Sequence, residues 1–210
     1  MALVQISSAL GLAKGTLHGL LSTLQGVGFV RQTHSGGPYL VTEDLAALGR
    51  DRLDPNELRS HALNWSDALA ARSGEAVKVA VFREGRAVVA HHVFGADTGR
   101  QVMATGSVVP LHASALGKVL LAFDPSAARF IVGRELPSLT FRTVTDRRTL
   151  TKELAAVRDN GWASAVEEDA VGRAGLAAPI RDRGGYVIAV VGIEGATARL
   201  CDERGRPRPA

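Results

Sequence analysis

The stretch Val4–Gln32 constrains the fold of this chain more than any other, because its apolar residues and glycines mark two short helices around a tight turn. Apolar residues at i, i+3 and i+4 predict one buried stripe on the first helix, made of Ile6, Ala9 and Leu10. Gly11 follows, where a helix end favours a residue that tolerates a positive φ. A second helix from about Ala13 is predicted to bury one face, formed by Leu17, Leu20, Leu21 and Leu24. This arrangement is typical of a helix-turn-helix.

The residues after the second helix predict a wing. Phe29–Gln32 has the pattern of a strand, Gly36–Pro38 that of a turn, and Tyr39–Val41 that of a returning strand. The chain carries no carboxylate before Glu43, and phosphate contacts need cations without competing anions. The predicted DNA-contacting residues are Lys14, Gly15, Thr16, His18, Gly19, Ser22, Arg31, Gln32 and His34. Two short helices around a glycine also occur in proteins that never contact DNA, so this motif alone leaves a purely structural role open.

Composition bounds the remaining possibilities. The 210 residues suffice for one sizeable domain or two small ones, and the formal net charge of +4 permits a nucleic-acid partner without requiring one. The single cysteine, Cys201, excludes an internal disulfide and any cysteine-based metal cluster. No apolar run reaches the roughly 20 residues of a membrane span, and no secretion signal is evident, so we expect a cytoplasmic protein without a membrane partner.

After the wing, the pattern predicts an α+β protein. Residues 42–48 read as a connecting helix, and Pro55 opens another whose predicted inner face is Leu58, Ala62, Trp65 and Leu69. Further helices are predicted at residues 114–123, 125–132 and 149–159. Strands are predicted at residues 76–82, 87–94, 101–104, 162–167, 175–181 and 186–193. Glu84-Gly85 and Arg183–Gly185 are the expected hairpin turns.

Motifs for catalysis are missing: there is no Gly-x-Ser-x-Gly elbow, phosphate loop, His-Glu-x-x-His or dinucleotide fingerprint. His91 and His92 are neighbours in a strand, so their rings point to opposite faces and cannot share a metal. His112 and Ser114 could form a base and a nucleophile, but Ser114 stands where a helix cap is expected. The adjacent carboxylates at residues 167 and 168 are expected in solvent or paired with Arg173. We therefore expect no enzyme activity, no metal and no cofactor.

Three motifs together resemble the IclR family of bacterial transcriptional regulators, and they occur in the family's order along nearly the whole chain. One is Pro110–Lys118 followed by Leu120–Ala122, which is similar to the signature of the family's effector domain. A second runs from Gly161 to Asp182, and a third, from Gly11 to Val30, resembles the recognition helix and wing. Within the family, residues 91–94 and 100–102 are most similar to the branch that regulates glycerol operons in actinobacteria.

The resemblance implies a winged helix-turn-helix over residues 1–42, a linker helix over 43–56 and a GAF-like effector domain with an antiparallel sheet over 57–210. It implies homodimers or homotetramers, a double-stranded DNA operator and a small metabolite effector. The family's first DNA-binding helix would precede Val4, and its last effector-domain helix would follow Pro209. Residues 1–210 by themselves are therefore expected to bind DNA weakly, because the apolar faces of the two encoded helices would lack a cover.

The resemblance also places an effector pocket beside the loop at residues 112–118. The residues expected to line it are Met103, Ala115, Leu116, Gly175, Gly192 and Glu194, with Arg173 at its mouth. Glyoxylate-binding members use a cysteine and two serines where this chain has Gly175, Gly192 and Glu194, and an acidic Glu194 would repel a carboxylate. A polyol or phosphorylated polyol is favoured over glyoxylate or pyruvate. The predicted function is a repressor released by such a metabolite; the alternative is a stand-alone binding module that no longer binds DNA.

Overall fold

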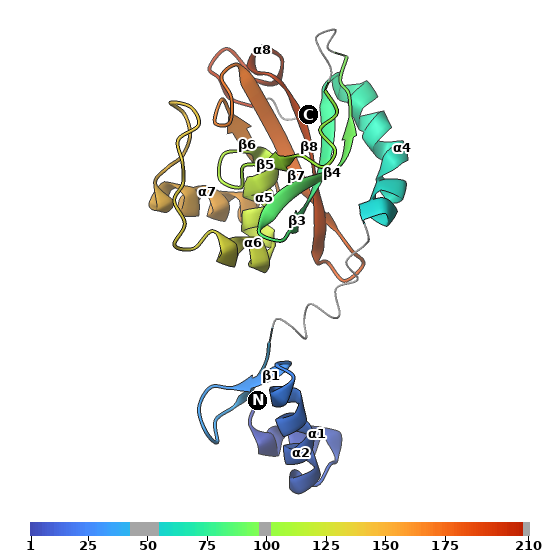
Figure 1. The fold of residues 1–210 in the computed structure, drawn as a ribbon, viewed down its shortest axis with the longest axis vertical. Helices are drawn as coiled ribbons and strands as arrows, with labels where there is room; N and C mark the ends of the chain where they lie inside the picture. The colour runs from blue at the N-terminus through green and yellow to red at the C-terminus, as the bar shows by residue number, and fades with distance from the viewer. Residues whose placement is uncertain (43–54, 97–101, 208–210) are drawn as a thin grey trace. The chain divides into compact units, whose positions relative to one another are not determined.

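A computed structural model describes residues 1–42, 55–96 and 102–207 of the protein (Figure 1). The chain divides into two compact units, Met1–Arg52 and Leu53–Ala210. The predicted connecting helix at residues 42–48 lies, apart from Thr42, outside the described residues. Among the helices that are described, none is both long and apolar enough to cross a membrane.

The first unit contains the two predicted helices and the wing. Its elements are α1 (Leu3–Leu10), α2 (Lys14–Gly26), β1 (Val30–Gln32) and β2 (Tyr39–Val41). Gly11 has the expected left-handed conformation, with φ at 64°, and lets the chain turn directly into the second helix. The two strands are antiparallel, and Val30 pairs with Val41.

The core of this unit is smaller than the sequence predicts. Leu17, Leu21, Val30 and Tyr39 form it, and Leu3, Ile6, Leu12 and Leu24 pack against its edge. The predictions that Leu10 and Leu20 are buried are wrong, because 61% and 51% of their surfaces are exposed. Leu10 is the last residue of α1. Leu20 lies outside the stripe that Leu17, Leu21 and Leu24 form at helical spacing. Ala9 is exposed as well.

The second unit is built on a six-stranded antiparallel sheet with the strand order β5-β4-β3-β8-β7-β6. The strands are β3 (Ala76–Arg83), β4 (Arg86–Val93), β5 (Val108–Val109), β6 (Ala163–Val166), β7 (Arg173–Arg181) and β8 (Val187–Ala196). The helices are α4 (Pro55–Ser73), α5 (Ala115–Phe123), α6 (Pro125–Phe130), α7 (Arg147–Asn160) and α8 (Thr197–Leu200). The predicted α+β class is confirmed.

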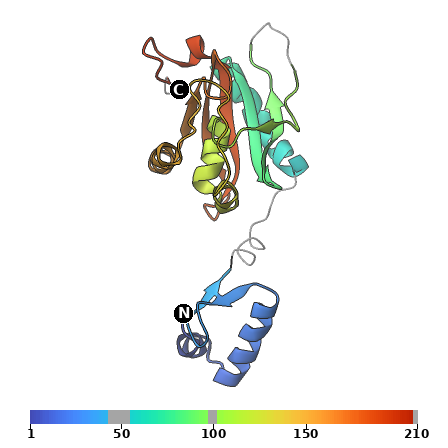
Figure 2. The ribbon, with the colours of Figure 1, turned by 60° about the vertical axis from the view of Figure 1, so that its left-hand side comes forward.

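Helices cover both faces of this sheet, so the unit has three layers (Figures 1 and 2). The larger core joins α5 and α7 to one face, with Val119, Leu120, Leu121 and Val190 almost completely buried. The smaller core joins Leu58 and Ala62 of α4 to the opposite face. The strands β3, β4 and β8 therefore alternate their side chains between two buried layers.

The inner face of α4 differs from the prediction. Leu58 and Ala62 are buried as expected, but Trp65 is 53% exposed and Ser66, the next residue, is buried at 1% exposure. At 3.6 residues per turn, Ser66 continues the row that Leu58 and Ala62 begin, each four residues apart. Hydrophobicity alone predicted that Trp65 would be buried. Because the helix packs close to the sheet, the small side chain of Ser66 is buried there instead.

The prediction of a strand at residues 101–104 is wrong for residues 102–104, which the structure describes. Residues 102–104 form no strand, and Gln101 lies outside the described residues. Pairing with β4 occurs a few residues later, where Val108 and Val109 pair with Val88 and Ala87. The turn at Glu84-Gly85 is confirmed, with φ values of 49° and 76° that close the β3–β4 hairpin.

Candidate functional site

The predicted DNA-contacting residues lie on α2 and the wing of the first unit. Leu17 and Leu21 hold one side of α2 against the core, which leaves the opposite side in solvent. The exposed predicted residues are Lys14, Gly15, Thr16, His18, Gly19, Ser22, Arg31 and His34. Gly15 and Gly19 are four residues apart, so they share one face. Apart from the helix's own backbone, no described heavy atom lies within 4 Å of a Cβ built on either. A phosphate or base edge could approach the helix backbone closely there.

Gln32 differs from the other predicted DNA contacts. Its side chain is only partly exposed, and its Nε2 donates a hydrogen bond to the Gly37 carbonyl oxygen at 3.1 Å. The bond joins the end of β1 to the turn that precedes β2. We therefore assign Gln32 to the internal support of the wing rather than to its DNA-facing surface.

The predicted effector residues mostly gather where the start of α5 meets β7 and β8. Ala115, Leu116, Gly175, Gly192 and Glu194 all line one small cavity of about 20 Å³. A Cβ on Gly192 would lie 2.7 Å from the Leu176 carbonyl oxygen and 3.1 Å from Leu116 Cδ2, so no larger residue fits there without rearrangement. This volume is of the order of a single water molecule and is too small for a polyol.

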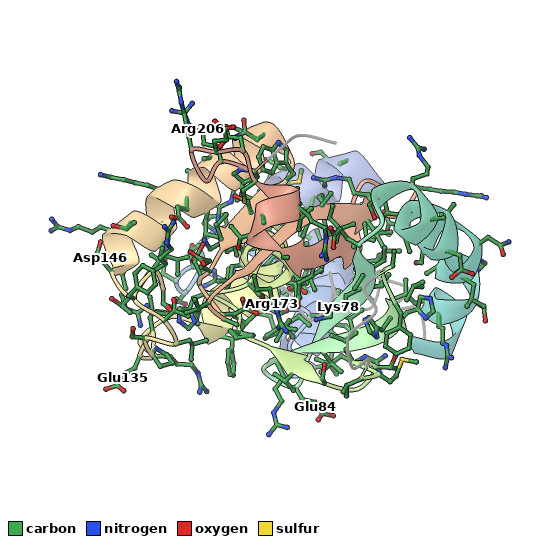
Figure 3. The ribbon with its side chains drawn as sticks, turned by 90° about the horizontal axis from the view of Figure 1, so that it is seen from above. Lys78, Glu84, Glu135, Asp146, Arg173 and Arg206 are labelled. Carbon is green, nitrogen blue, oxygen red and sulfur yellow. The ribbon has the colours of Figure 1, made fainter. Side chains whose placement is uncertain are left out.

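A larger hollow of about 490 Å³ adjoins this cavity through Lys78 and Glu194, which line both. Its wall includes His92 and Arg173. Arg173 of β7 and Lys78 of β3 lie close together (Figure 3), since both contact Glu194. The prediction that Met103 lines the same space is not met, because Met103 is 56% exposed and borders neither cavity. Its neighbours Val102 and Ala104 border the hollow instead.

Glu194 is held between two cations. Its Oε2 lies 2.8 Å from Lys78 Nζ, and its Oε1 lies 3.0 Å from Arg173 Nη1. Arg173 Nη1 also lies 3.7 Å from Asp169 Oδ2. The expectation that Glu194 repels an anionic ligand treated it as an isolated negative charge, whereas Lys78 and Arg173 together balance the charges of Glu194 and Asp169. Lys78 was not recognised in the sequence, because nothing local indicates that a lysine in β3 faces residue 194.

Burial and nearby charges shift two titratable groups in this region. Burial, and then the neighbouring Lys78 ammonium, lower the pKa of His92, so this imidazole stays neutral at pH 7. Its Nδ1 accepts a hydrogen bond from the Ala104 backbone N–H at 3.2 Å. Burial, and then the Glu194 carboxylate, raise the pKa of Asp169. The hollow thus offers fixed ammonium and guanidinium donors, carboxylate acceptors and a neutral ring.

The two histidines of β4 point to opposite faces, as predicted. Arg59 and Asp67 of α4 are the charges that act on His91, whereas Lys78 and Glu194 act on His92. Among the described residues, no group of three or more histidine, cysteine, aspartate or glutamate side chains could hold a metal ion.

Ser114 and His112 do not form a catalytic pair. Ser114 Oγ accepts a hydrogen bond from the Gly117 backbone N–H at 3.0 Å and donates one to the Pro110 carbonyl oxygen at 2.5 Å. His112 is buried, and its Nε2 lies 2.9 Å from the Pro137 carbonyl oxygen, to which it donates as the Nε2–H tautomer. The prediction that Ser114 caps the helix is confirmed, because it is the N-cap of α5.

Ser114→Ala is expected to lower the free energy of unfolding by about 1–2 kcal/mol, because it removes a buried helix cap. Urea denaturation would measure the change. Thr151→Ala on the exposed side of α7 is the control and should change stability by no more than about 0.5 kcal/mol. Equal effects of the two substitutions would show that the cap contributes nothing.

The partners of the adjacent carboxylates differ from the prediction. Glu168 is buried and lies 2.6 Å from Lys118 Nζ, whereas Glu167 Oε2 lies 3.1 Å from Arg142 Nε. Arg173, the predicted partner, instead contacts Asp169 and Glu194. Fifty residues separate Lys118 from Glu168, so sequence proximity could not indicate the pair.

Comparisons with known proteins cover both units. A family model described as the C-terminal part of the bacterial transcriptional regulator IclR matches residues 51–209, and one described as the IclR helix-turn-helix domain matches residues 1–34. The chain is 45% identical over 209 residues to a glycerol operon regulatory protein of Streptomyces coelicolor, covering 100% of this chain and 82% of that protein. It is 44% identical over 203 residues to the protein of the same name from Streptomyces griseus, covering 97% and 80%.

A solved structure has the same fold. The crystal structure of Thermotoga maritima IclR is 27% identical in sequence, with a TM-score of 0.64. The match covers 98% of this chain and 83% of that one.

Proposed function

Because the chain belongs to the IclR family of bacterial transcriptional regulators, which are not enzymes, we propose that it represses a metabolic operon and releases it when a polyol or phosphorylated polyol binds. We assign residues 1–42 to DNA binding, 43–56 to the linker and 57–210 to effector binding. The protein would act in the cytoplasm as a homodimer or homotetramer on a double-stranded operator, since paired half-sites need paired readers.

One observation carries this proposal: the DNA-binding match and the effector-domain match lie in one chain, over residues 1–34 and 51–209. A stand-alone binding module would have no need of the exposed polar face of α2 or of a stretch of 42 residues without a carboxylate. The alternative of a module that no longer binds DNA is therefore not favoured.

The chemistry of the larger hollow supports a phosphorylated polyol. Both contacts of Arg173 use Nη1, and a guanidinium carries five N–H donors, so further donors can meet a phosphate. Lys78 supplies a second cation on the same side, and Glu194 between them can accept hydrogen bonds from hydroxyl groups. Two relatives are named as regulators of glycerol operons, which agrees with a three-carbon polyol as the organic part.

The proposed repression is tested by selecting genomic DNA fragments that the protein retains and titrating the complexes with candidate effectors. Glycerol 3-phosphate or glycerol should release the selected DNA. Deleting the gene that encodes this protein should raise the expression of a reporter placed behind a promoter on that DNA. Retention of no fragment, with effector binding intact, would favour the stand-alone module instead.

A thermal-shift screen tests the effector class. Glycerol 3-phosphate should stabilise the protein, by about 2.7 kcal/mol at a concentration a hundred times its Kd. Arg173→Ala should abolish the preference for glycerol 3-phosphate over glycerol, because the phosphate loses its guanidinium. Arg183→Ala, an exposed cation in the β7–β8 turn, is the control. Stabilisation by pyruvate alone would contradict the assignment.

A further inference from the structure

A second hollow, of about 570 Å³, lies away from the effector residues, beside β6 at the edge of the sheet. Helix α7 contributes Glu153, and the loop before α7 contributes Phe141 and Val144. Trp162 lies next to the edge strand, and Lys118 and Glu168 border the same space. Its volume and its mixture of aromatic surface with a few charged groups are those of a small-molecule site.

The charges inside this hollow do not balance. Lys118 Nζ lies 2.6 Å from Glu168 Oε1 and 2.8 Å from Glu153 Oε2, so one ammonium faces two carboxylates. Lys118 and Glu168 are only 2% and 8% exposed. Arg142 also borders the hollow, but its guanidinium is matched by Glu167, 3.1 Å away. The cluster of Lys118, Glu153 and Glu168 therefore carries one negative charge in excess when both carboxyls are ionised.

The second oxygen of Glu168 has no partner. Its Oε2 is buried and accepts no hydrogen bond from any described residue. A buried acceptor without a donor destabilises the folded protein, and more so when it is charged. Burial accordingly raises the pKa of Glu168, with the Lys118 ammonium acting in the opposite direction. A second cation beside the cluster would offset the excess charge.

Aromatic rings stand beside these carboxylates. Phe141 is 79% exposed and Trp162 is 42% exposed, although both border the hollow. Large aromatic side chains usually bury their surface, and the faces of phenyl and indole rings attract cations. The Arg142 guanidinium already lies 5.5 Å from the centre of the Phe141 ring, so a cation is tolerated there.

We propose that this hollow binds a small organic ammonium ion, with the ammonium beside the carboxylates of Glu153 and Glu168 and the apolar part against Trp162 and Phe141. The two carboxylates disfavour an anion. A divalent metal would need more ligands than the cluster supplies, since no suitable group of three such side chains occurs among the described residues. The site is separate from the proposed effector hollow, which is bordered by Lys78 and Arg173.

Benzylamine is a suitable probe, because it joins a primary ammonium to a phenyl ring, and benzyl alcohol is its uncharged counterpart. Trp65→Phe would leave Trp162 as the single tryptophan of the chain, so that fluorescence reports on this hollow. Benzylamine should give a saturable change in emission, and benzyl alcohol should bind at least about tenfold more weakly because it lacks the charge.

Further variants, made in the Trp65→Phe protein, test whether benzylamine binds in this hollow and not elsewhere. Glu168→Gln should weaken benzylamine binding by about tenfold or more, since it removes the charge that meets the ammonium. Phe141→Ala, at an exposed position that should not affect folding, should weaken it several-fold. Arg183→Ala, at an exposed position in the β7–β8 turn, should leave the affinity for benzylamine unchanged. The proposal is overturned if benzylamine gives no saturable signal, if benzyl alcohol binds equally well, or if Glu168→Gln and Phe141→Ala both keep the original affinity.

Discussion

Lys118→Met should lower the free energy of unfolding by about 3–5 kcal/mol at pH 8, because it leaves two carboxylates near each other without their cation. Lys118 is 2% exposed, and its ammonium contacts Glu153 and Glu168. Methionine has a similar length and no charge, so the substitution tests the ion pairs more than the packing. Urea denaturation with a two-state fit would give the difference.

The loss of unfolding free energy caused by Lys118→Met should become smaller as the pH falls. Burial raises the pKa of Glu168 above that of an unfolded glutamate, so the folded state takes up a proton more readily and gains stability relative to the unfolded state as the solution becomes acidic. Without Lys118 the pKa should rise further, since the ammonium no longer opposes the proton. We therefore expect a smaller loss at pH 5 than at pH 8.

Lys152→Met is the matched control, because Lys152 is exposed on the same helix as Glu153. It should change stability by no more than about 0.5 kcal/mol at either pH. A loss for Lys118→Met that equals this control, or that does not depend on pH, would show that the buried pairs contribute little.

Replacing Lys14 and Arg31 together by alanine should weaken operator binding strongly and reduce its dependence on salt. Each phosphate contact that is lost lowers the slope of log K against log salt by about 0.9, so the double variant should lose about 1.8 per DNA-bound copy. At low salt this corresponds to roughly a hundredfold loss of affinity. Both side chains are exposed on α2 and the wing, and no carboxylate precedes Glu43 in the sequence.

Substitutions at Thr16 and His18 should act differently. These side chains are exposed on α2, where a major-groove reader contacts base edges, so alanine should relax sequence preference and keep the salt slope. Gel-shift titrations on operator and unrelated DNA at several salt concentrations would separate the two behaviours. Arg183→Ala, which removes an exposed cation outside α2 and the wing, is the control. If none of the four α2 and wing substitutions alters binding, the surface assignment is wrong.

The sequence by itself determined the features that depend on local chemistry. Gly11 ends a helix with a positive φ, Ser114 caps α5, and Glu84-Gly85 closes a hairpin. Each of these depends on the conformations and hydrogen bonds of a few neighbouring residues, which the residue types fix directly. The α+β class followed for the same reason, because helical and strand periodicities are local patterns.

The composition of the candidate effector site was predicted only in part. Gly175, Gly192 and Glu194 meet as expected, since β7 and β8 form one hairpin and Gly175 pairs with Glu194. Lys78 joins them only because β3 pairs with β8, which places Lys78 opposite Gly192. A pairing between strands so far apart in the chain has no local signature, so neither Lys78 nor the ion pairs of Glu194 could be foreseen.

Only the tertiary structure decided which side chains were buried and which charges met. Trp65 is exposed and Ser66 is buried because α4 approaches the sheet closely along the row of Leu58 and Ala62. Lys118 meets Glu168 because α5 packs on the same face that the end of β6 borders. Periodicity gives the spacing of a helical stripe, but its rotation about the helix axis and the partner of a buried charge depend on the neighbouring element, which the local sequence does not specify.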